Sequence, residues 1–363
     1  MAPDHDEQLA HPERAPGGGD DARGIVRRWG RRVAIVDLDG AGRRIELDET
    51  VADHARLSGA ALALAPFAAS AAPVFTLAVG EAVERGVPTA ARVTVAARAP
   101  LRSGVTEAQC GGPFAFDLAA LLDGLVLSGH AAAPVHVVIG GGGVHLRPGT
   151  AQTASLSART REALEHGGSA LVVGPAADAG LPFANIASVG GAGAPSFVGR
   201  GGLGAALRAA GVLSIGVETR AVRGAADAGQ LAAALGRSPR LLERARGGTL
   251  ELAPHRGAAR VERGEGAARH GCRGCPTPCG WVLELEEEGA PRRALGRYAA
   301  MHGCAASGEA ARCRDRCNEL GMDARSAARL VRDLEREAAR PGVLDELAAP
   351  GRPAFAAALA LGP

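Results

Sequence analysis

The chain has 363 residues, enough for two domains of ordinary size, and its 47% hydrophobic content is typical of a globular protein. Lysine is absent, so the 41 arginines nearly balance 39 acidic residues and leave a formal net charge of +2. This balance argues against a nucleic-acid binder, and no apolar run approaches the roughly 20 residues of a membrane span. We therefore expect a cytoplasmic protein with neither nucleic-acid nor membrane partners.

The N-terminal part of the chain is expected to pass from a tail into strands. Residues 1–24 are polar and rich in proline, glycine and aspartate, so this segment is predicted to be a disordered tail. From 30 to 48, apolar and polar residues alternate on both sides of Asp39-Gly40-Ala41-Gly42, which predicts a β-hairpin. Further strands are predicted at 74–79, 91–96, 124–128, 135–139, 170–173 and 213–217, and helices at 155–165 and 204–210.

The second part of the chain has a different pattern. Residues 221–264 are rich in alanine and arginine and are expected to lead into a second domain, in which 297–320 and 324–339 are predicted helices. No internal repeat is apparent. The predicted fold class is α+β, with a sheet-rich domain at 25–220 and a mainly helical one at 221–363.

Six of the seven cysteines fall between Cys272 and Cys317, a crowding that favours metal binding over a disulfide framework. Cys272, Cys275 and Cys279 stand in the string HGCRGCPTPCGW, where glycine and prolines favour one tight loop. This spacing predicts three ligands of an iron–sulfur cluster, with structural zinc as the alternative and three unligated thiols as a third reading. A fourth ligand from Cys304, from Cys313 or from another chain would complete the site.

Two glycine-rich segments stand out in the first domain. In VGRGGLGAAL, residues Arg200, Gly201, Gly202 and Gly204 precede an apolar helical run, so backbone amides there could approach an anion. The alternative is that these glycines serve the geometry of a turn only. The second segment, Gly140–Gly143, lies between two predicted strands and is expected to be a hairpin turn. His136 and His145 are expected to be ordinary strand residues, with metal ligation as the alternative.

The order GRGGLGA followed by CxxCPxxCG resembles the aldehyde ferredoxin oxidoreductase family of tungsten or molybdenum pterin enzymes. The strings WGRRVAIVDLDGAGRRIELDE, VPTAARVTVAARAPL, EAQCGGPFAFDLAALLDGLVLSG and RCNELGMDARSAARL extend the likeness over residues 29–345. The resemblance implies that Arg92, Gly111 and Gly112, together with the Arg200–Gly204 segment, face a tungsten or molybdenum bis-pterin. It also implies that the loop cysteines bind a 4Fe-4S cluster.

The implied activity is oxidation of an aldehyde to a carboxylic acid, with electrons leaving through the cluster to ferredoxin. The chain departs from the family pattern, because it ends within the expected second domain and because Gln109 and Cys110 stand where asparagine and serine are usual. A partner chain supplying the remaining domains is therefore expected, and the catalytic residues stay unassigned. The alternatives are an iron–sulfur electron-transfer or scaffold subunit without pterin, and a zinc-stabilised interaction module.

Overall fold

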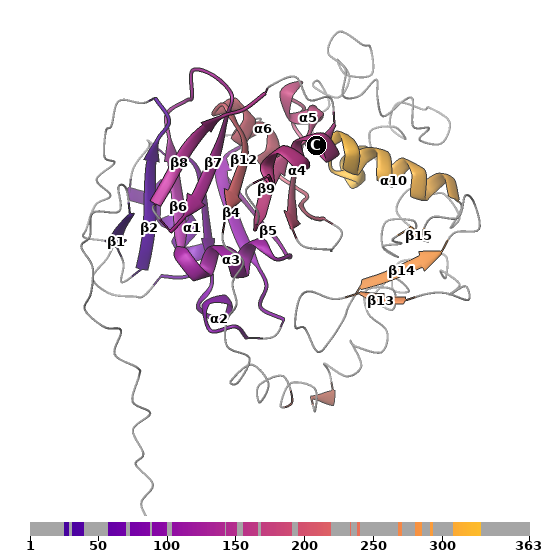
Figure 1. Cartoon of the computed structure of the whole chain (residues 1–363), viewed down its shortest axis with the longest axis horizontal. Helices are drawn as coiled ribbons and strands as arrows, with labels where there is room; N and C mark the ends of the chain where they lie inside the picture. Colours follow the sequence, from indigo (N-terminus) through magenta and orange to yellow (C-terminus); the bar gives the residue numbers. More distant parts are fainter. Residues whose placement is uncertain are drawn as a thin grey trace, which may run out of the picture.

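The computed structural model contains two six-stranded sheets joined by short helices (Figure 1). It describes residues 25–28, 31–39, 57–69, 73–87, 89–99, 104–141, 143–150, 155–165, 168–190, 195–218, 233, 238–239, 268–270, 280–284, 291–292 and 308–327. The predicted tail at 1–24 and most of residues 219–307 lie outside these ranges.

The first sheet has the strand order β1-β2-β6-β3-β4-β5. Its parallel pair is β2 with β6, and its other neighbours are antiparallel. Helices α1 and α2 follow β2 and β3, and α3 connects β5 to β6. The elements are β1 (Ile25–Arg28), β2 (Arg31–Asp37), α1 (Ala60–Ala69), β3 (Pro73–Val79), α2 (Glu81–Glu84), β4 (Val93–Arg98), β5 (Val105–Cys110), α3 (Phe114–Leu121) and β6 (Gly124–Ser128).

The second sheet has the order β11-β10-β9-β12-β7-β8. Here the parallel pair is β12 with β7, and the other neighbours are again antiparallel. The elements are β7 (Val135–Gly140), β8 (Gly143–Pro148), α4 (Leu156–Ala163), β9 (Ser169–Val173), α5 (Pro175–Asp178), β10 (Ile186–Gly190), β11 (Ser196–Val198), α6 (Leu203–Ala209) and β12 (Val212–Val217).

The two sheets share one hydrophobic core, and helices α3 and α6 contact strands of both sheets. Side-chain alternation decides which layer each strand residue joins. In β9, Leu171 and Val173 enter the shared core, whereas Ala170 and Val172 pack in a separate cluster with Leu156 of α4. Helix α1 covers the outer face of the first sheet in the same way. The layers are therefore α1, first sheet, α3 with α6, second sheet, and α4.

The two halves repeat one topology, contrary to the expectation that the chain has no internal repeat. Each runs strand, outer helix, strand, short helix, two antiparallel strands, inner helix, and a last strand that is parallel to the first; the second half has β8 in addition, between its first strand β7 and its outer helix α4. The repeat is visible in the sequence after β3 and β9, where VGEAVERGVP and VGPAADAGLP share valine, glycine, alanine, glycine and proline at the same spacing. Gly86 and Gly180, at equivalent positions, both have positive φ.

The structure describes fewer elements after residue 218 than before it. Helix α10 (Gly308–Leu320) is followed by residues that dock on the second half, where Asp323 N donates to Phe183 O at 2.9 Å. Cys317, Leu320 and Met322 join the shared core. A small antiparallel sheet comprises β13 (Ala268–His270), β14 (Gly280–Glu284) and β15 (Pro291–Arg292).

Most of the predicted elements are confirmed, including the hairpin turn between β7 and β8, which pairs Gly140 with Gly143. The predicted hairpin at 30–48 is confirmed only for its first strand, β2, because its second strand lies outside the described residues. The elements that were not predicted are strands β1, β5, β10, β11, β13, β14 and β15 and helices α1, α2, α3 and α5. No helix in the described ranges combines the length and the apolar character needed to cross a bilayer.

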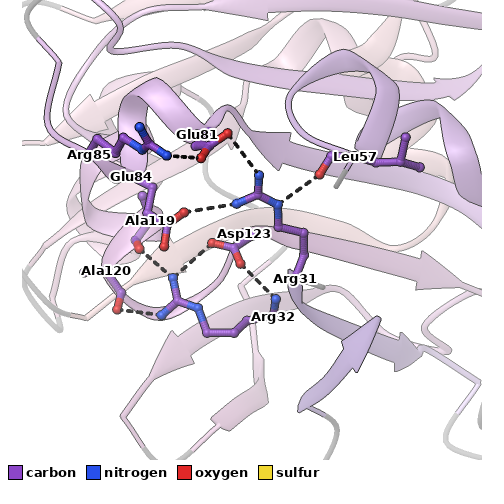
Figure 2. A network of polar contacts seen from close by, with 9 residues as sticks. All are labelled: Arg31, Arg32, Leu57, Glu81, Glu84, Arg85, Ala119, Ala120 and Asp123. Atoms are coloured by element: carbon purple, nitrogen blue, oxygen red, sulfur yellow. Dashed lines mark hydrogen bonds and ion pairs between the residues drawn. The ribbon is translucent and has the colours of Figure 1, made fainter. Parts of the chain in front are cut away.

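A network of buried charges anchors the start of the first sheet (Figure 2). The Arg32 guanidinium donates to the carbonyls of Ala119 and Ala120 at the end of α3 and to Asp123 Oδ1 at 3.0 Å. Asp123 also accepts from the Arg32 backbone N–H at 2.8 Å. The neighbouring Arg31 binds Glu84 and the Leu57 carbonyl. These contacts tie β2 to the C-terminal end of α3, where a cation is favourable.

Replacing Asp123 with alanine should lower the free energy of unfolding by about 3 kcal/mol, because it leaves the Arg32 charge buried without its partner. Urea denaturation followed by circular dichroism measures the change. The control is Arg85→Ala, which removes an exposed ion pair with Glu81 and should cost less than about 1 kcal/mol. Equal losses in the two variants would contradict the assigned role of Asp123.

Candidate functional site: the seam between the two sheets

The candidate site lies where the edge strands of the two sheets, β5 and β11, pack beside each other. Each strand leads through a Gly-Gly pair into an inner helix, Gly111-Gly112 into α3 and Gly201-Gly202 into α6. We call these two strands and their glycine turns the seam. Its two sides occupy equivalent positions in the repeated topology, so residues almost a hundred positions apart become neighbours.

The glycine turns pack against side chains of the opposite sheet. Gly112 has φ +115°, and a Cβ there would lie 2.8 Å from Ser188 Oγ in β10. Gly201 has φ +85°, and a Cβ there would lie 2.3 Å from Thr106 Oγ1 in β5. Both positions therefore exclude other residues, for conformational and for steric reasons.

The remaining glycines of the motif also meet close neighbours. Gly202 is the N-cap of α6 with φ +68°, and a Cβ on Gly204 would lie 2.3 Å from the Asn185 carbonyl oxygen. The interpretation that these glycines serve a turn is thus supported by the geometry. The motif by itself does not demand a ligand.

On the first-half side, Arg92 and Cys110 lie near Ser188. The Cys110 thiol is buried, and burial raises its pKa to about 12, although Ser188 and the Arg92 charge act in the opposite direction. Arg92 itself is exposed and makes no hydrogen bond or ion pair within the described residues. The Ser188 hydroxyl is buried and has no hydrogen-bond partner of ordinary geometry there. Arg92 and Gly112, predicted from separate strings, therefore lie at the same turn: the Arg92 charge acts on Cys110, which pairs with Val93, and Gly112 packs against Ser188.

On the second-half side, residues after α10 meet the glycine turn. Burial raises the pKa of Asp323. Two effects oppose this: the Ser326 hydroxyl and backbone N–H donate to Asp323 Oδ2, and the Arg200 charge favours the ionised carboxylate. The Asn185 side-chain amide donates to Met322 O at 2.9 Å, while its Oδ1 is buried with no partner among the described residues. Arg200 is exposed.

Sequence reasoning missed Asn185, Ser188 and Asp323 as residues of the seam. The repeat of VGEAVERGVP as VGPAADAGLP could have located Asn185 and Ser188. It aligns β10, the strand that contains Ser188, with β4, the strand that follows Arg92. Asp323 has no such signal, since only docking of a distant segment places it there.

The three loop cysteines, Cys272, Cys275 and Cys279, lie outside the described residues, between β13 and β14. Cys304 also lies outside them, and Cys313 belongs to α10. Within the described ranges, no group of three or more His, Cys, Asp and Glu side chains is arranged to hold a metal. The cluster-ligand assignment therefore stays a prediction.

The raised pKa of Cys110 predicts an unreactive thiol. Because the folded pKa is about 12 and the ordinary value is 9.0, the neutral thiol dominates in the native protein throughout pH 7–9. Alkylation at pH 8 should leave Cys110 unmodified in the native protein and modify it after unfolding in guanidinium, as read by mass spectrometry of its peptide. Rapid labelling of Cys110 in the native protein, with the fold intact by circular dichroism, would contradict its burial.

This architecture is similar to that of known proteins. A model of the aldehyde ferredoxin oxidoreductase N-terminal domain matches residues 59–219, which include the whole seam but not the docked residues after α10. No curated protein matches the chain. A similar solved structure is the active-site complex BamBC of benzoyl coenzyme A reductase with 1,5-dienoyl-CoA, at TM-score 0.63 and 14% identity.

That alignment covers 92% of this chain and 62% of the other, so this chain spans less than two thirds of the length of its structural relative. At such low identity the likeness establishes the fold alone. The family assignment rests on the matched domain, and the two-sheet architecture agrees with it. Residues 59–219 therefore form an N-terminal domain of the aldehyde ferredoxin oxidoreductase family.

Proposed function

We propose that the seam is the pterin-facing surface of an oxidoreductase that converts an aldehyde to a carboxylic acid. The observation that carries this proposal is the convergence of Arg92, Gly112 and the Arg200–Gly204 segment on one seam, although they come from three separate strings of sequence. A bis-pterin has two similar halves. A seam built from two repeated halves, each with a Gly-Gly turn and an exposed arginine nearby, matches that symmetry.

The residues present fit such a group in charge and in shape. Exposed guanidiniums suit the phosphates of a pterin cofactor, and Arg92 has no competing partner among the described residues. The buried Asn185 Oδ1 is a further polar atom without a partner there, and the buried Ser188 Oγ has only the Cys110 thiol beside it. When bound, the metal–pterin group would supply the two-electron oxidation. The role of this chain's residues is to hold and orient the group.

Cys272, Cys275 and Cys279 are proposed to bind a 4Fe-4S cluster that carries electrons from the pterin to ferredoxin. The register of β13 with β14 pairs His270 with Gly280, so the described residues on either side of the cysteine segment are neighbours. A loop whose two ends are neighbours suits a cluster site, because its three thiolates must all reach the same metal cluster.

The complete enzyme is proposed to need a second chain. The chain covers 62% of its structural relative, which is itself described as a complex. Enclosure of the cofactor matters because preorganised electrostatics act best where water is excluded. Residues from a partner would close the side of the pterin that the seam leaves open.

Arg92→Gln should reduce the pterin content of anaerobically purified protein at least several-fold, because it removes an exposed charge from the proposed phosphate contact. Tungsten and molybdenum measured by mass spectrometry should fall in parallel. Arg161→Gln, which changes an exposed arginine on α4 away from the seam, should retain both.

Two results would count against this assignment. Unchanged pterin in Arg92→Gln would remove Arg92 from the site, and iron with sulfide but no pterin in the wild-type protein would favour the electron-transfer subunit instead.

Cys275→Ser should lower the iron and acid-labile sulfide of the anaerobic protein by more than half and abolish its broad visible absorption, because a cubane cluster rarely survives loss of a ligand. Cys110→Ser is the matched control, since Cys110 is buried beside Ser188, and should leave iron unchanged. Zinc at one equivalent without iron in the wild-type protein would support the zinc module and overturn the cluster assignment.

A further inference from the structure

A second polar site lies at the other end of the second sheet from the seam. A cavity of about 100 Å³ opens between β7, β8, β12 and α4, lined by His136, Ser214, Glu162, Arg147 and Glu218 among others. In the strand order β11-β10-β9-β12-β7-β8, four strand spacings separate β11 from β7, or about 19 Å. The cavity is therefore distinct from the seam, and neither the family match nor the proposed function accounts for it.

His136 and Glu162 face each other in this cavity without a proper hydrogen bond. His136 Nε2 lies 3.2 Å from Glu162 Oε1, yet Nε2 has no hydrogen-bond partner among the described residues. The residue is 6% exposed, so water does not solvate the ring freely. Glu162 Oε2 is likewise buried and without a partner there. His136 Nε2 and Glu162 Oε1 thus lie close together at the cavity, and the second carboxylate oxygen, Oε2, has no partner among the described residues.

The outer contacts of both side chains hold them in this arrangement. Ser214 Oγ lies 2.7 Å from His136 Nδ1, which fixes the ring on its far side. Glu162 Oε1 accepts from the Thr150 backbone N–H at 3.1 Å and from the Thr150 hydroxyl at 2.9 Å. Burial opposes ionisation, but the Thr150 donors and the His136 ring outweigh it and lower the pKa of Glu162. The carboxylate is therefore charged at neutral pH.

We propose that this cavity binds one divalent transition-metal ion of the zinc class through His136 Nε2 and the Glu162 carboxylate, with water completing its coordination. With Ser214 accepting from Nδ1–H, the Nε2 lone pair is free to coordinate, which is the usual outer-shell arrangement of a metal-bound histidine. Nitrogen and oxygen ligands of a tetrahedral zinc lie about 3.3 Å apart, close to the separation found here. The partly exposed Arg147–Glu218 pair lies at the cavity edge, on the route to solvent.

The competing explanation is a simple ion pair between a histidinium and the carboxylate. An ion pair alone would gain by aligning the Nε2–H bond with Oε1, and it would leave Glu162 Oε2 buried without a partner. A metal ion removes both defects together.

Co²⁺ titration of the full chain tests the proposal, with the visible spectrum as the readout. Cobalt on nitrogen and oxygen lacks the intense sulfur-to-cobalt charge-transfer band of a thiolate site, so uptake here is distinguished from uptake by the cysteine loop. We expect one equivalent of Co²⁺ with nitrogen–oxygen character. Glu162→Gln, which can keep the Thr150 contacts, and His136→Gln should each weaken this binding at least about 100-fold.

Glu165→Gln is the matched control, because Glu165 lines the same cavity and changes the same charge but is exposed. It should bind Co²⁺ with nitrogen–oxygen character as the wild type does. No nitrogen–oxygen cobalt signal in the wild type would overturn the proposal. Equal binding by wild type and Glu162→Gln would do the same, since Glu162→Gln retains the shape of the site.

Discussion

The contact of each glycine turn with the opposite sheet constrains the whole first part of the molecule. Gly112 meets Ser188 of the second sheet, and Gly201 meets Thr106 of the first, each at a distance that no Cβ would tolerate. These contacts set how closely β5 and β11 approach. The inner helices α3 and α6 begin at the same turns, so their positions between the sheets follow from the same constraint. The shared core can close only when both turns are glycine.

The same constraint determines which atoms the seam offers to a ligand. Because the turns have no side chains, backbone and the hydroxyl of Ser188 come to the junction, with Arg92 and Arg200 exposed nearby. The buried Cys110 thiol, held neutral by its surroundings, contributes no charge there. Positive charge at the seam thus comes from arginines of both halves. Residues 321–323 bring an acidic group to the same place, because their docking puts the Asp323 carboxyl within the influence of the Arg200 charge.

Much of this fold could be predicted from sequence, and the failures have physical causes. Strands such as β6 and β9 were found because buried apolar runs specify them. Strand β5 was missed because VTEAQC alternates exposed and half-buried residues without an apolar stripe, and α1 because Pro66 interrupts its pattern. The repeat went unseen because residue identity is concentrated around the α2 and α5 turns. The residues of the seam could be named one by one, but their convergence requires the packing of two sheets. His136 was predicted to be an ordinary strand residue, since its contacts with Ser214 and Glu162 are tertiary.

The cavity at His136 and the seam are separated by most of a sheet, but the helices that border them, α4 and α6, are both ion-paired to Asp178 of α5. Glu162 lies on α4, and one turn earlier on that helix the buried Arg159 binds Asp178 of α5. Asp178 also accepts from Arg208 Nε at 2.6 Å, and Arg208 belongs to α6, the helix that begins at the seam's glycine turn. An ion held by Glu162 would restrain α4, and this chain of contacts would pass that restraint to α6. The cavity and the seam are therefore bordered by helices that one carboxylate, Asp178, holds together, and Arg208 makes its contact in the last turn of α6.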